Sequence, residues 1–397
     1  MSTSSRGPAA DRSLSPQSML TACQELVHDE VMPQVETWDR DDVLPQAILD
    51  RLSTIGVPAA MVPTRYGGPE LSVADLVPVW RTLAQGWISL TGAVNTTYLG
   101  TALLLRYGTE AQRKRWLPAI ASGGVWSSFS ITEPQAGSDV QHLETEVEPA
   151  DDGLIITGAK QWIAGGISFP LAFMLATERG AERPSCVVLP ATGRGSDSWQ
   201  TQWLEKVGYR GVESAAWTFV HHHAVGAEIL GGEDGRGRGL GQMIDVLAIG
   251  RVNVACRALG IIDRALTCAL EESTTRVIGD GLLGNHTHAR LRIGELRARQ
   301  RAVEAVIDAA ARGIDTGDPE AGELASAAKV IASDTAIWAV DTASRLAASR
   351  SYTWESELAR LRRDAPQTQI GEGANDALLL SLGKTLIRSA AAGPLRS

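Results

Sequence analysis

Two stretches of the chain combine acidic or hydroxyl side chains with glycine and proline in patterns that could support chemistry. The first is Phe129-Ser-Ile-Thr-Glu-Pro-Gln-Ala-Gly-Ser-Asp139, where an apolar run meets a proline and then a Gly-Ser-Asp turn. Such a segment ends a strand and leaves main-chain N–H groups free near Thr132 and Ser138, which suits a polar ring edge or a phosphate. An ordinary transition from strand to loop fits the same composition.

The second stretch places one carboxylic acid between glycines. Arg360-Leu-Arg-Arg-Asp-Ala365 is followed by Gln369-Ile-Gly-Glu-Gly373, so Glu372 has only small neighbours. A general base must come close to the proton that it removes, and partial desolvation raises its pKa toward neutrality. Small neighbours permit that approach and leave the Glu372 N–H free to bind a developing oxyanion. A solvated acid in a glycine-rich loop is the alternative interpretation.

Both stretches resemble signatures of the acyl-CoA dehydrogenase family, and the resemblance covers about residues 20 to 390 in the order helical, β, helical. It implies that Glu372 removes the α-proton of an acyl thioester while the β-hydride passes to N5 of FAD. An electron-transfer flavoprotein or a similar acceptor would then reoxidise the flavin. Gly371 stands where the family has Tyr, and Ala374 where it has Thr.

The resemblance also assigns binding residues. Those implied at the cofactor are Phe129, Ile131, Thr132, Ser138, Trp162, Ile163, Ala164, Arg276, Ala374 and Asn375. Those implied at the substrate are Ser138, Arg251 and Gly373. Trp162 would cover one side of the flavin ring, and Arg251 would lie near enough to Glu372 to influence its ionisation. Ala164 replaces a Thr or Ser whose hydroxyl could bind the N5 edge.

Arg276 corresponds to an arginine that, in the family, reaches the cofactor of a neighbouring subunit. This implies a homotetramer or a homodimer. The Phe-Gly that normally follows this arginine is replaced by Val277-Ile-Gly-Asp280, and the glycine-rich segment expected before Tyr352 is also lost. Both departures concern the adenine and pyrophosphate end of FAD.

The elements that must position these residues divide the chain into an α+β arrangement. Residues 1–15 read as a floppy tail and residues 16–124 as an N-terminal helical domain. Short apolar runs rich in branched or aromatic residues over 125–235 predict an antiparallel β-barrel or sandwich. Amphipathic stretches near 240–275, 285–313, 320–348 and 373–392 predict a four-helix bundle within 236–397.

Composition limits the classes of function. The formal charge of −9 argues against nucleic acid as the main partner. No uninterrupted apolar run reaches the length of about 20 residues that crosses a bilayer. The N-terminus lacks the apolar segment of a signal peptide, and the four cysteines are far apart. We therefore expect a cytoplasmic protein with unpaired cysteines.

Two further motifs give weaker indications of a binding site. His221-His-His223 suggests a metal, but neighbouring strand residues point to opposite faces and no carboxylate or cysteine cluster accompanies them. Gly235-Arg-Gly-Arg-Gly-Leu-Gly241 follows no Rossmann-like strand, so a linker explains it better than a dinucleotide loop. We expect neither a metal site nor a dinucleotide-binding fold.

Alternatives to the thioester dehydrogenase remain open. A flavin-dependent monooxygenase or oxidase on the same fold is favoured by Ala164 and opposed by Glu372, and a flavin-free relative is supported only by the altered adenine-end residues. The thioester could be on coenzyme A or on an acyl carrier protein. Arg113–Arg115 and Arg290–Arg301 are the candidate basic patches for a carrier, and both also suit solvated helix faces.

Overall fold

The N-terminal part of the computed structural model, which describes residues 15–137 and 142–392, is helical. Its helices are α1 (Pro16–Glu25), a π-helical turn (Leu26–Val31), α2 (Val35–Asp41), α3 (Gln46–Ile55), α4 (Val73–Gly86), α5 (Ile88–Tyr107) and α6 (Glu110–Ala121). Thr109 caps α6 in a reciprocal pair with Gln112, as the sequence predicts. The floppy tail expected over residues 1–15 lies almost wholly outside the described residues.

Helix α5 carries the side chains on which much of the site depends. It is long and apolar enough to cross a membrane by length and composition, yet 94% of its apolar window is buried inside the protein. It packs against β1 on one side and α7 on the other. Its apolar character is therefore that of a central core helix.

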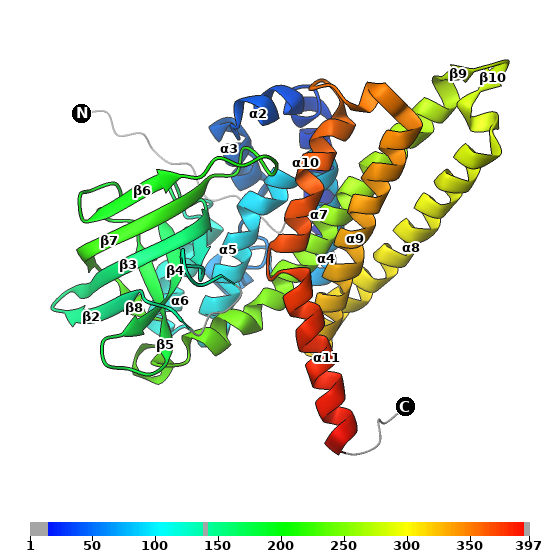
Figure 1. The fold of residues 1–397 in the computed structure, drawn as a ribbon. Coiled ribbons are helices and arrows are strands. Elements are labelled where there is room, and N and C mark those ends of the chain that lie inside the picture. Colours follow the sequence, from blue (N-terminus) through cyan, green and yellow to red (C-terminus); the bar gives the residue numbers. More distant parts are fainter. Residues whose placement is uncertain (1–14, 138–141, 393–397) are drawn as a thin grey trace, which may run out of the picture.

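A single sheet follows, drawn at the left of Figure 1. Its strands are β1 (Ser127–Ser130), β2 (Glu146–Ala150), β3 (Gly153–Ala164), β4 (Leu171–Glu178), β5 (Pro184–Pro190), β6 (Trp199–Trp203), β7 (Ser214–Val225) and β8 (Glu228–Ile229). They run in the order β6-β7-β3-β2-β4-β5-β8, with β1 also paired to β4. The interior of this sheet holds its own apolar core, which includes Trp199, Trp217 and Phe219.

The sheet is mixed rather than antiparallel throughout, which corrects that detail of the sequence prediction. Strand β4 pairs in parallel with β1, opposite Phe129, and with the start of β2. Six consecutive residues of β4 are buried, Leu171 to Ala176. A continuous apolar run is typical of a strand covered on both faces, where parallel partners are found.

The C-terminal part is helical, at the right of Figure 1. It contains α7 (Gly239–Thr275), a short hairpin of β9 (Val277–Ile278) and β10 (Gly281–Leu282), α8 (Thr287–Thr316), α9 (Ala321–Ala347), α10 (Glu357–Ile370) and α11 (Asn375–Ala392). Helices α8 and α10 both pack against α7 and α9, so α10 is the fourth member of the bundle. The predicted stretch 373–392 corresponds to α11, which projects away from the bundle in Figure 1.

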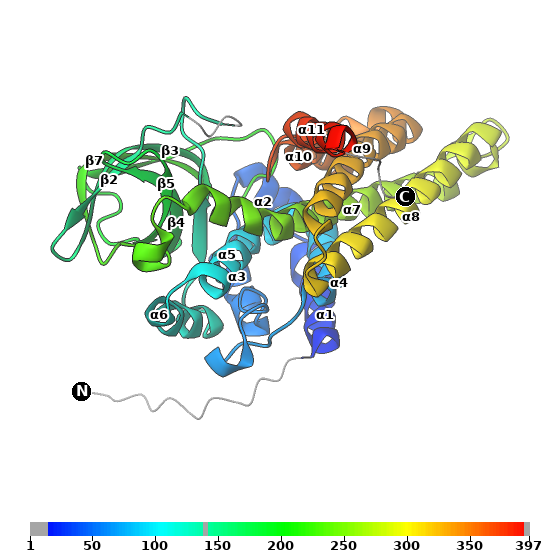
Figure 2. The same cartoon turned by 90° about the horizontal axis from the view of Figure 1, so that it is seen from below.

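The parts meet along α7. Figure 2 shows α7 running beside α5 and continuing past the sheet, and α7 contacts α4, α5, β5, α8 and α9. The main apolar core is continuous across these helices and the adjacent face of the sheet. The site residues are thus held between rigid elements rather than on isolated loops.

Candidate active site

Glu372 lies in the turn between α10 and α11 with a left-handed backbone, φ +56°, and Gly373 follows at φ +98°. A non-glycine residue in this region is uncommon and stores strain, so the surrounding structure must hold it. The Nε of Arg251 donates to the main-chain oxygen of Glu372 at 3.3 Å. Gly373, expected at the substrate, presents its own oxygen to Lys329 at 2.7 Å.

The Glu372 carboxylate points between α5 and α7. Its Oε1 accepts a hydrogen bond from Asn95 Nδ2 at 2.6 Å. On the other side lies Gly250 of α7, where an added Cβ would come within 2.9 Å of the carboxyl carbon. The absence of a side chain at Gly250 therefore leaves the space that the Glu372 carboxylate occupies.

Burial raises the pKa of Glu372 above its ordinary value, and Arg257, Arg251, the bond from Asn95 and Lys329 act in the opposite direction. A carboxyl group with a raised pKa is a stronger base once it is deprotonated. The positive side chains keep the charged form accessible. The site therefore has the electrostatic properties that proton abstraction needs.

Lys329 of α9 fixes the turn that carries Glu372. Its side chain is completely buried, and Nζ donates to the oxygens of Gln369 and Gly373 and to Oδ1 of Asn375, at 2.7 to 2.8 Å. Asn375, expected at the cofactor, begins α11 and also donates to Asp334 and Ser333. In this structure Asn375 thus joins α11 to α9, and Ala374 lies between it and Gly373.

Six of the residues expected at the flavin, all within residues 129–164, lie where β1 ends beside β3. Thr132 accepts a hydrogen bond from the Gln161 N–H at 2.9 Å, which places the segment after β1 next to Trp162. Phe129 and Ile131 are half-buried against the main core, Ile163 is buried inside the sheet, and Ala164 pairs with Ser214 of β7. Ser138 lies outside the described residues.

Trp162 has the geometry of a wall for a planar ligand. The strand pairing shifts register between Lys160 and Ile163, and Trp162 in this bulge has φ +61° with 57% of its surface exposed. Bulges next to active sites commonly redirect a side chain. An exposed indole can stack against an aromatic ring system such as the flavin.

A buried ion pair ties the segment after β1 to strand β3. Lys160 Nζ lies 2.7 Å from Glu133 Oε1, and both side chains are almost fully buried. Glu133 also accepts from the N–H groups of Glu144 and Thr145, and Lys160 donates to the oxygen of Ile131. Burial lowers the pKa of Lys160 to about 8, against the opposing effect of Glu133.

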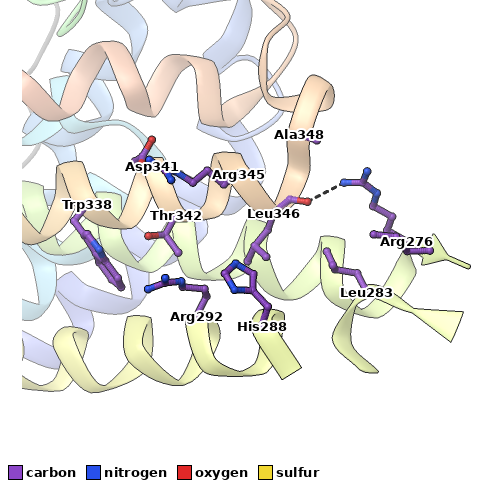
Figure 3. Close-up of a pocket in the computed structure, with 11 residues that line it drawn as sticks. Arg276, Leu283, His288, Arg292, Trp338, Asp341, Thr342, Arg345, Leu346 and Ala348 are labelled. Carbon is purple, nitrogen blue, oxygen red and sulfur yellow. Dashed lines mark hydrogen bonds and ion pairs between the residues drawn. The ribbon is translucent and has the colours of Figure 1, made fainter. Parts of the chain in front are cut away.

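Arg276 is far from Glu372 in the same chain. It follows Arg251 by 25 residues along α7, about 37 Å at the helical rise. Figure 3 shows it at the rim of a pocket of about 410 Å³, where its Nη1 donates to the oxygen of Leu346 at 2.8 Å. Arg292 and His288 of α8 and Arg345 and Trp338 of α9 also line this pocket. Cationic groups beside an indole suit a phosphate-bearing aromatic ligand.

The sequence analysis missed the residues that enclose Glu372 from distant parts of the chain. Asn95, Arg257 and Lys329 carried no local motif. The one signal for Lys329 was a single lysine within the otherwise apolar run of α9. Among the described residues no group of His, Cys, Asp and Glu could hold a metal ion. His221 and His223 line a surface pocket of the sheet, whereas His222 is buried against Trp199.

Three family models match the chain in order. They are described as the N-terminal, middle and C-terminal domains of acyl-CoA dehydrogenase, and they cover residues 15–124, 128–221 and 237–387. The probable acyl-CoA dehydrogenase FadE25 of Mycobacterium tuberculosis is 28% identical over 375 residues, 93% of this chain and 95% of its own. The mitochondrial isobutyryl-CoA dehydrogenase of Dictyostelium discoideum is 25% identical, over 91% of this chain and 86% of its own.

Solved structures share the fold. The butyryl-CoA dehydrogenase of Megasphaera elsdenii superposes with a TM-score of 0.88 at 24% identity, over 96% of this chain and all of its own. The prolyl acyl carrier protein oxidase AnaB gives a TM-score of 0.85 at 22% identity, over 94% and 98% of the two chains. A glutaryl-CoA dehydrogenase of Mycobacterium smegmatis in complex with FADH2 gives 0.84 at 20%, over 95% and 96%.

Proposed function

Because the chain belongs to the acyl-CoA dehydrogenase family of oxidoreductases, we propose that it catalyses the FAD-dependent α,β-dehydrogenation of an acyl thioester with Glu372 as the base. The observation that carries this proposal is the enclosed carboxylate of Glu372, which Asn95 orients at 2.6 Å. Burial raises the pKa of this carboxyl group, as a base for a weakly acidic α-proton requires.

The residues of the chain have distinct tasks in this reaction. Glu372 takes the α-proton, and its own main-chain N–H is available to the thioester oxygen on which negative charge develops. Asn95 orients the carboxylate. Arg251 and Lys329 hold the turn by donating to the main-chain oxygens of Glu372 and Gly373, respectively. Small neighbours on either side of Glu372 leave room for the substrate.

The family's cofactor, FAD, fits the residues that surround Thr132 and Trp162. Family members bind flavin, as the FADH2 complex of a structural relative illustrates. We place the ring against Trp162 and the end of β1, where bound FAD would supply the hydride acceptor. The pocket at Arg276 would hold the adenine and pyrophosphate end of a neighbouring subunit's FAD. An electron-transfer flavoprotein or a similar acceptor would reoxidise it.

The thioester carrier is proposed as coenzyme A or an acyl carrier protein. Relatives named for both exist, including a glutaryl-CoA dehydrogenase in complex with glutaryl-CoA and the prolyl acyl carrier protein oxidase. The flavin oxidase or monooxygenase alternative is favoured by Ala164, which pairs with Ser214 and offers no hydroxyl. Oxygen consumption during turnover separates that alternative from a dehydrogenase.

The decisive experiment replaces the base. Glu372→Gln keeps the size of the side chain but cannot accept the proton, so bleaching of the flavin absorbance by a good acyl thioester should slow by about two to four powers of ten. Thioester binding should change far less. Stopped-flow absorbance of the purified holoprotein measures both.

Glu233→Gln is the matched control, because Glu233 is 84% exposed and lies outside the site. It should bleach at the rate of the unmodified protein. Unchanged bleaching in Glu372→Gln would show that the base or the reaction is wrong. Absence of flavin bands from the native protein, with no recovery on adding FAD, would contradict the cofactor.

A further inference from the structure

Arg257 is a buried cation whose hydrogen-bond partners are all neutral. It lies on α7 with 2% of its surface exposed. Its Nε donates to Asn253 Oδ1 at 2.9 Å, and its Nη1 lies 3.3 Å from the Tyr209 hydroxyl and 3.5 Å from Gln367 Oε1. Within residues 15–137 and 142–392 it forms no ion pair with a carboxylate.

A second buried arginine, Arg360, differs from Arg257 because it is paired with carboxylates. Arg360 is 1% exposed, and its guanidinium lies 2.9 Å from Glu36 and 3.4 Å from Glu357. Burying a charge without an opposite charge is costly. Arg257 acts on the charge of Glu372 but forms no ion pair with it, so the hydrogen-bond partners of its guanidinium supply no opposite charge.

Helical spacing places Arg257 on the face of α7 that meets Glu372. Gly250, Asn253 and Arg257 are three and four residues apart, so they share one side of the helix. Gly250 lies against the Glu372 carboxyl group. Helical side chains lean toward the N-terminus, and the bond from Arg257 to Asn253 follows that direction. The guanidinium thus points back toward Glu372. Measured along the axis of α7, it lies about one helical turn, roughly 5 Å, farther toward the C-terminus than Glu372.

The opposite wall of this region is polar as well. Asn95 of α5 has 1% exposure, and its Oδ1 has no hydrogen-bond partner among the described residues, as is also true of Nδ2 of the fully buried Asn253. One turn earlier on α5, an added Cβ at Gly92 would lie 1.8 Å from the Tyr209 hydroxyl. Glycine at this position lets that hydroxyl reach Arg257.

We propose that Arg257 binds a carboxylate at the far end of the acyl group, so that the substrate is the thioester of a short dicarboxylic acid. This inference rests on the proposed function, because it extends the same site beyond Glu372. A carboxylate would complete the neutral set of Asn253, Tyr209 and Gln367 with the charged acceptor that a guanidinium prefers. The separation of about one helical turn suits an acyl chain of about five or six carbons.

A structural alternative is that Arg257 only offsets the charge of Glu372. In that case its removal should affect all thioesters alike, through the ionisation of the base. The dicarboxylate proposal instead expects an effect that depends on the acyl group. Thioesters of equal chain length with and without a terminal carboxylate therefore distinguish the two.

The experiment measures flavin bleaching in the holoprotein with the coenzyme A and pantetheine thioesters of glutaric, pentanoic, adipic and hexanoic acids. We expect kcat/KM to favour at least one diacid over its uncharged counterpart by about thirtyfold or more, mostly through KM. Arg257→Gln should abolish this preference, so that the ratio of kcat/KM between a diacid and its uncharged counterpart falls to about one, whatever the common change in rate that follows from the altered ionisation of Glu372. Arg257→Lys, which keeps the charge, should restore part of it.

Each outcome decides a different question. Equal rates for matched thioesters in the unmodified protein would overturn the inference, and this comparison needs no variant to fold. A loss of rate in Arg257→Gln that is equal for both classes, with a shifted pH profile, would also overturn it. If none of the thioesters bleaches the flavin, the proposed dehydrogenase function itself fails.

Discussion

The reactivity assigned to Glu372 depends on a balance between burial and nearby positive charge. Burial raises the pKa of the carboxyl group, whereas Arg257, Arg251, Asn95 and Lys329 lower it. In the part of the chain that the structure describes, Asn95 is the only one of these that donates a hydrogen bond to the carboxylate, at 2.6 Å. It is therefore the residue through which the base can be adjusted without changing a nearby charge.

Asn95→Ala should move the pH dependence of the reaction. The amide stabilises the charged carboxylate, so removing it raises the pKa of Glu372 further, and deprotonation then requires a higher pH. A hydrogen bond to a charged group is worth about 1.5–3 kcal/mol, equivalent to a shift of about one to two pH units. Stopped-flow bleaching between pH 5 and 9 should show the rise of rate displaced to higher pH.

The control is Asn285→Ala, an exposed amide in the turn before α8. Its pH profile should match that of the unmodified protein. A profile that stays in place for Asn95→Ala, with only the maximal rate lowered, would mean that Asn95 positions the side chain without affecting its ionisation.

At the scale of elements, the segment after β1 and strand β3 are joined by the pair of Glu133 and Lys160. The two partners differ in what else they contact. Glu133 retains N–H donors from Glu144 and Thr145, whereas Lys160 Nζ has only one other hydrogen bond to the described residues, to the oxygen of Ile131. Loss of the carboxylate should therefore be worse than loss of the amine.

Glu133→Gln should lower the free energy of unfolding by about 3–5 kcal/mol, because it leaves Lys160 as an uncompensated buried charge. Lys160→Met should cost less, and the double variant should cost less than the sum of the two. Urea denaturation measures all three. Since the pair joins the segments that carry Thr132 and Trp162, FAD affinity should fall in parallel with stability.

The pair of Glu110 and Lys114 provides a surface comparison. These side chains are 60% and 70% exposed and lie 3.5 Å apart. Glu110→Gln and Lys114→Met should each change stability by no more than about 1 kcal/mol. Equal effects at the buried and the exposed pair would contradict the tethering role of Glu133 and Lys160.

Sequence reasoning succeeded where the determining interactions are local. The capping of α6 by Thr109, the order of helical and β parts and the long helices α7, α8 and α9 follow from periodicity and turn residues. The parallel pairing of β1 with β4 joins residues more than forty positions apart, so no local pattern could reveal it. Helix α10 was missed because its residues were read only as a motif.

The same distinction applies to the candidate site. Glu372 could be singled out from its glycine neighbours and its family resemblance. Its partner Asn95 is 277 residues away in sequence. Buried polar groups such as Asn95, Arg257 and Lys329 look like ordinary helix residues until tertiary packing brings them together. Their roles therefore emerge only from the fold.

At the scale of the whole molecule, α11 leaves an apolar surface uncovered. Figure 1 shows the helix extending away from the bundle. Leu379, Leu380, Leu386 and Ile387 are 50%, 58%, 50% and 72% exposed. The two pairs are seven residues apart, so they form one stripe along the helix. A contiguous exposed apolar surface of this kind usually marks an interface.

We expect this stripe to join copies of the chain into a homodimer or homotetramer, and the double variant Leu380→Glu and Ile387→Glu to dissociate it. Charged groups would have to be buried at the contact, which is unfavourable. Light scattering of the holoprotein at micromolar concentration should show an oligomer for the unmodified protein and a smaller species for the variant. Val43→Glu, at another exposed apolar residue with 51% exposure, should leave the mass unchanged. If the pocket at Arg276 of one subunit holds the adenine end of the FAD bound to another subunit, dissociation should also weaken FAD binding. A monomeric unmodified protein with FAD still bound would contradict both expectations.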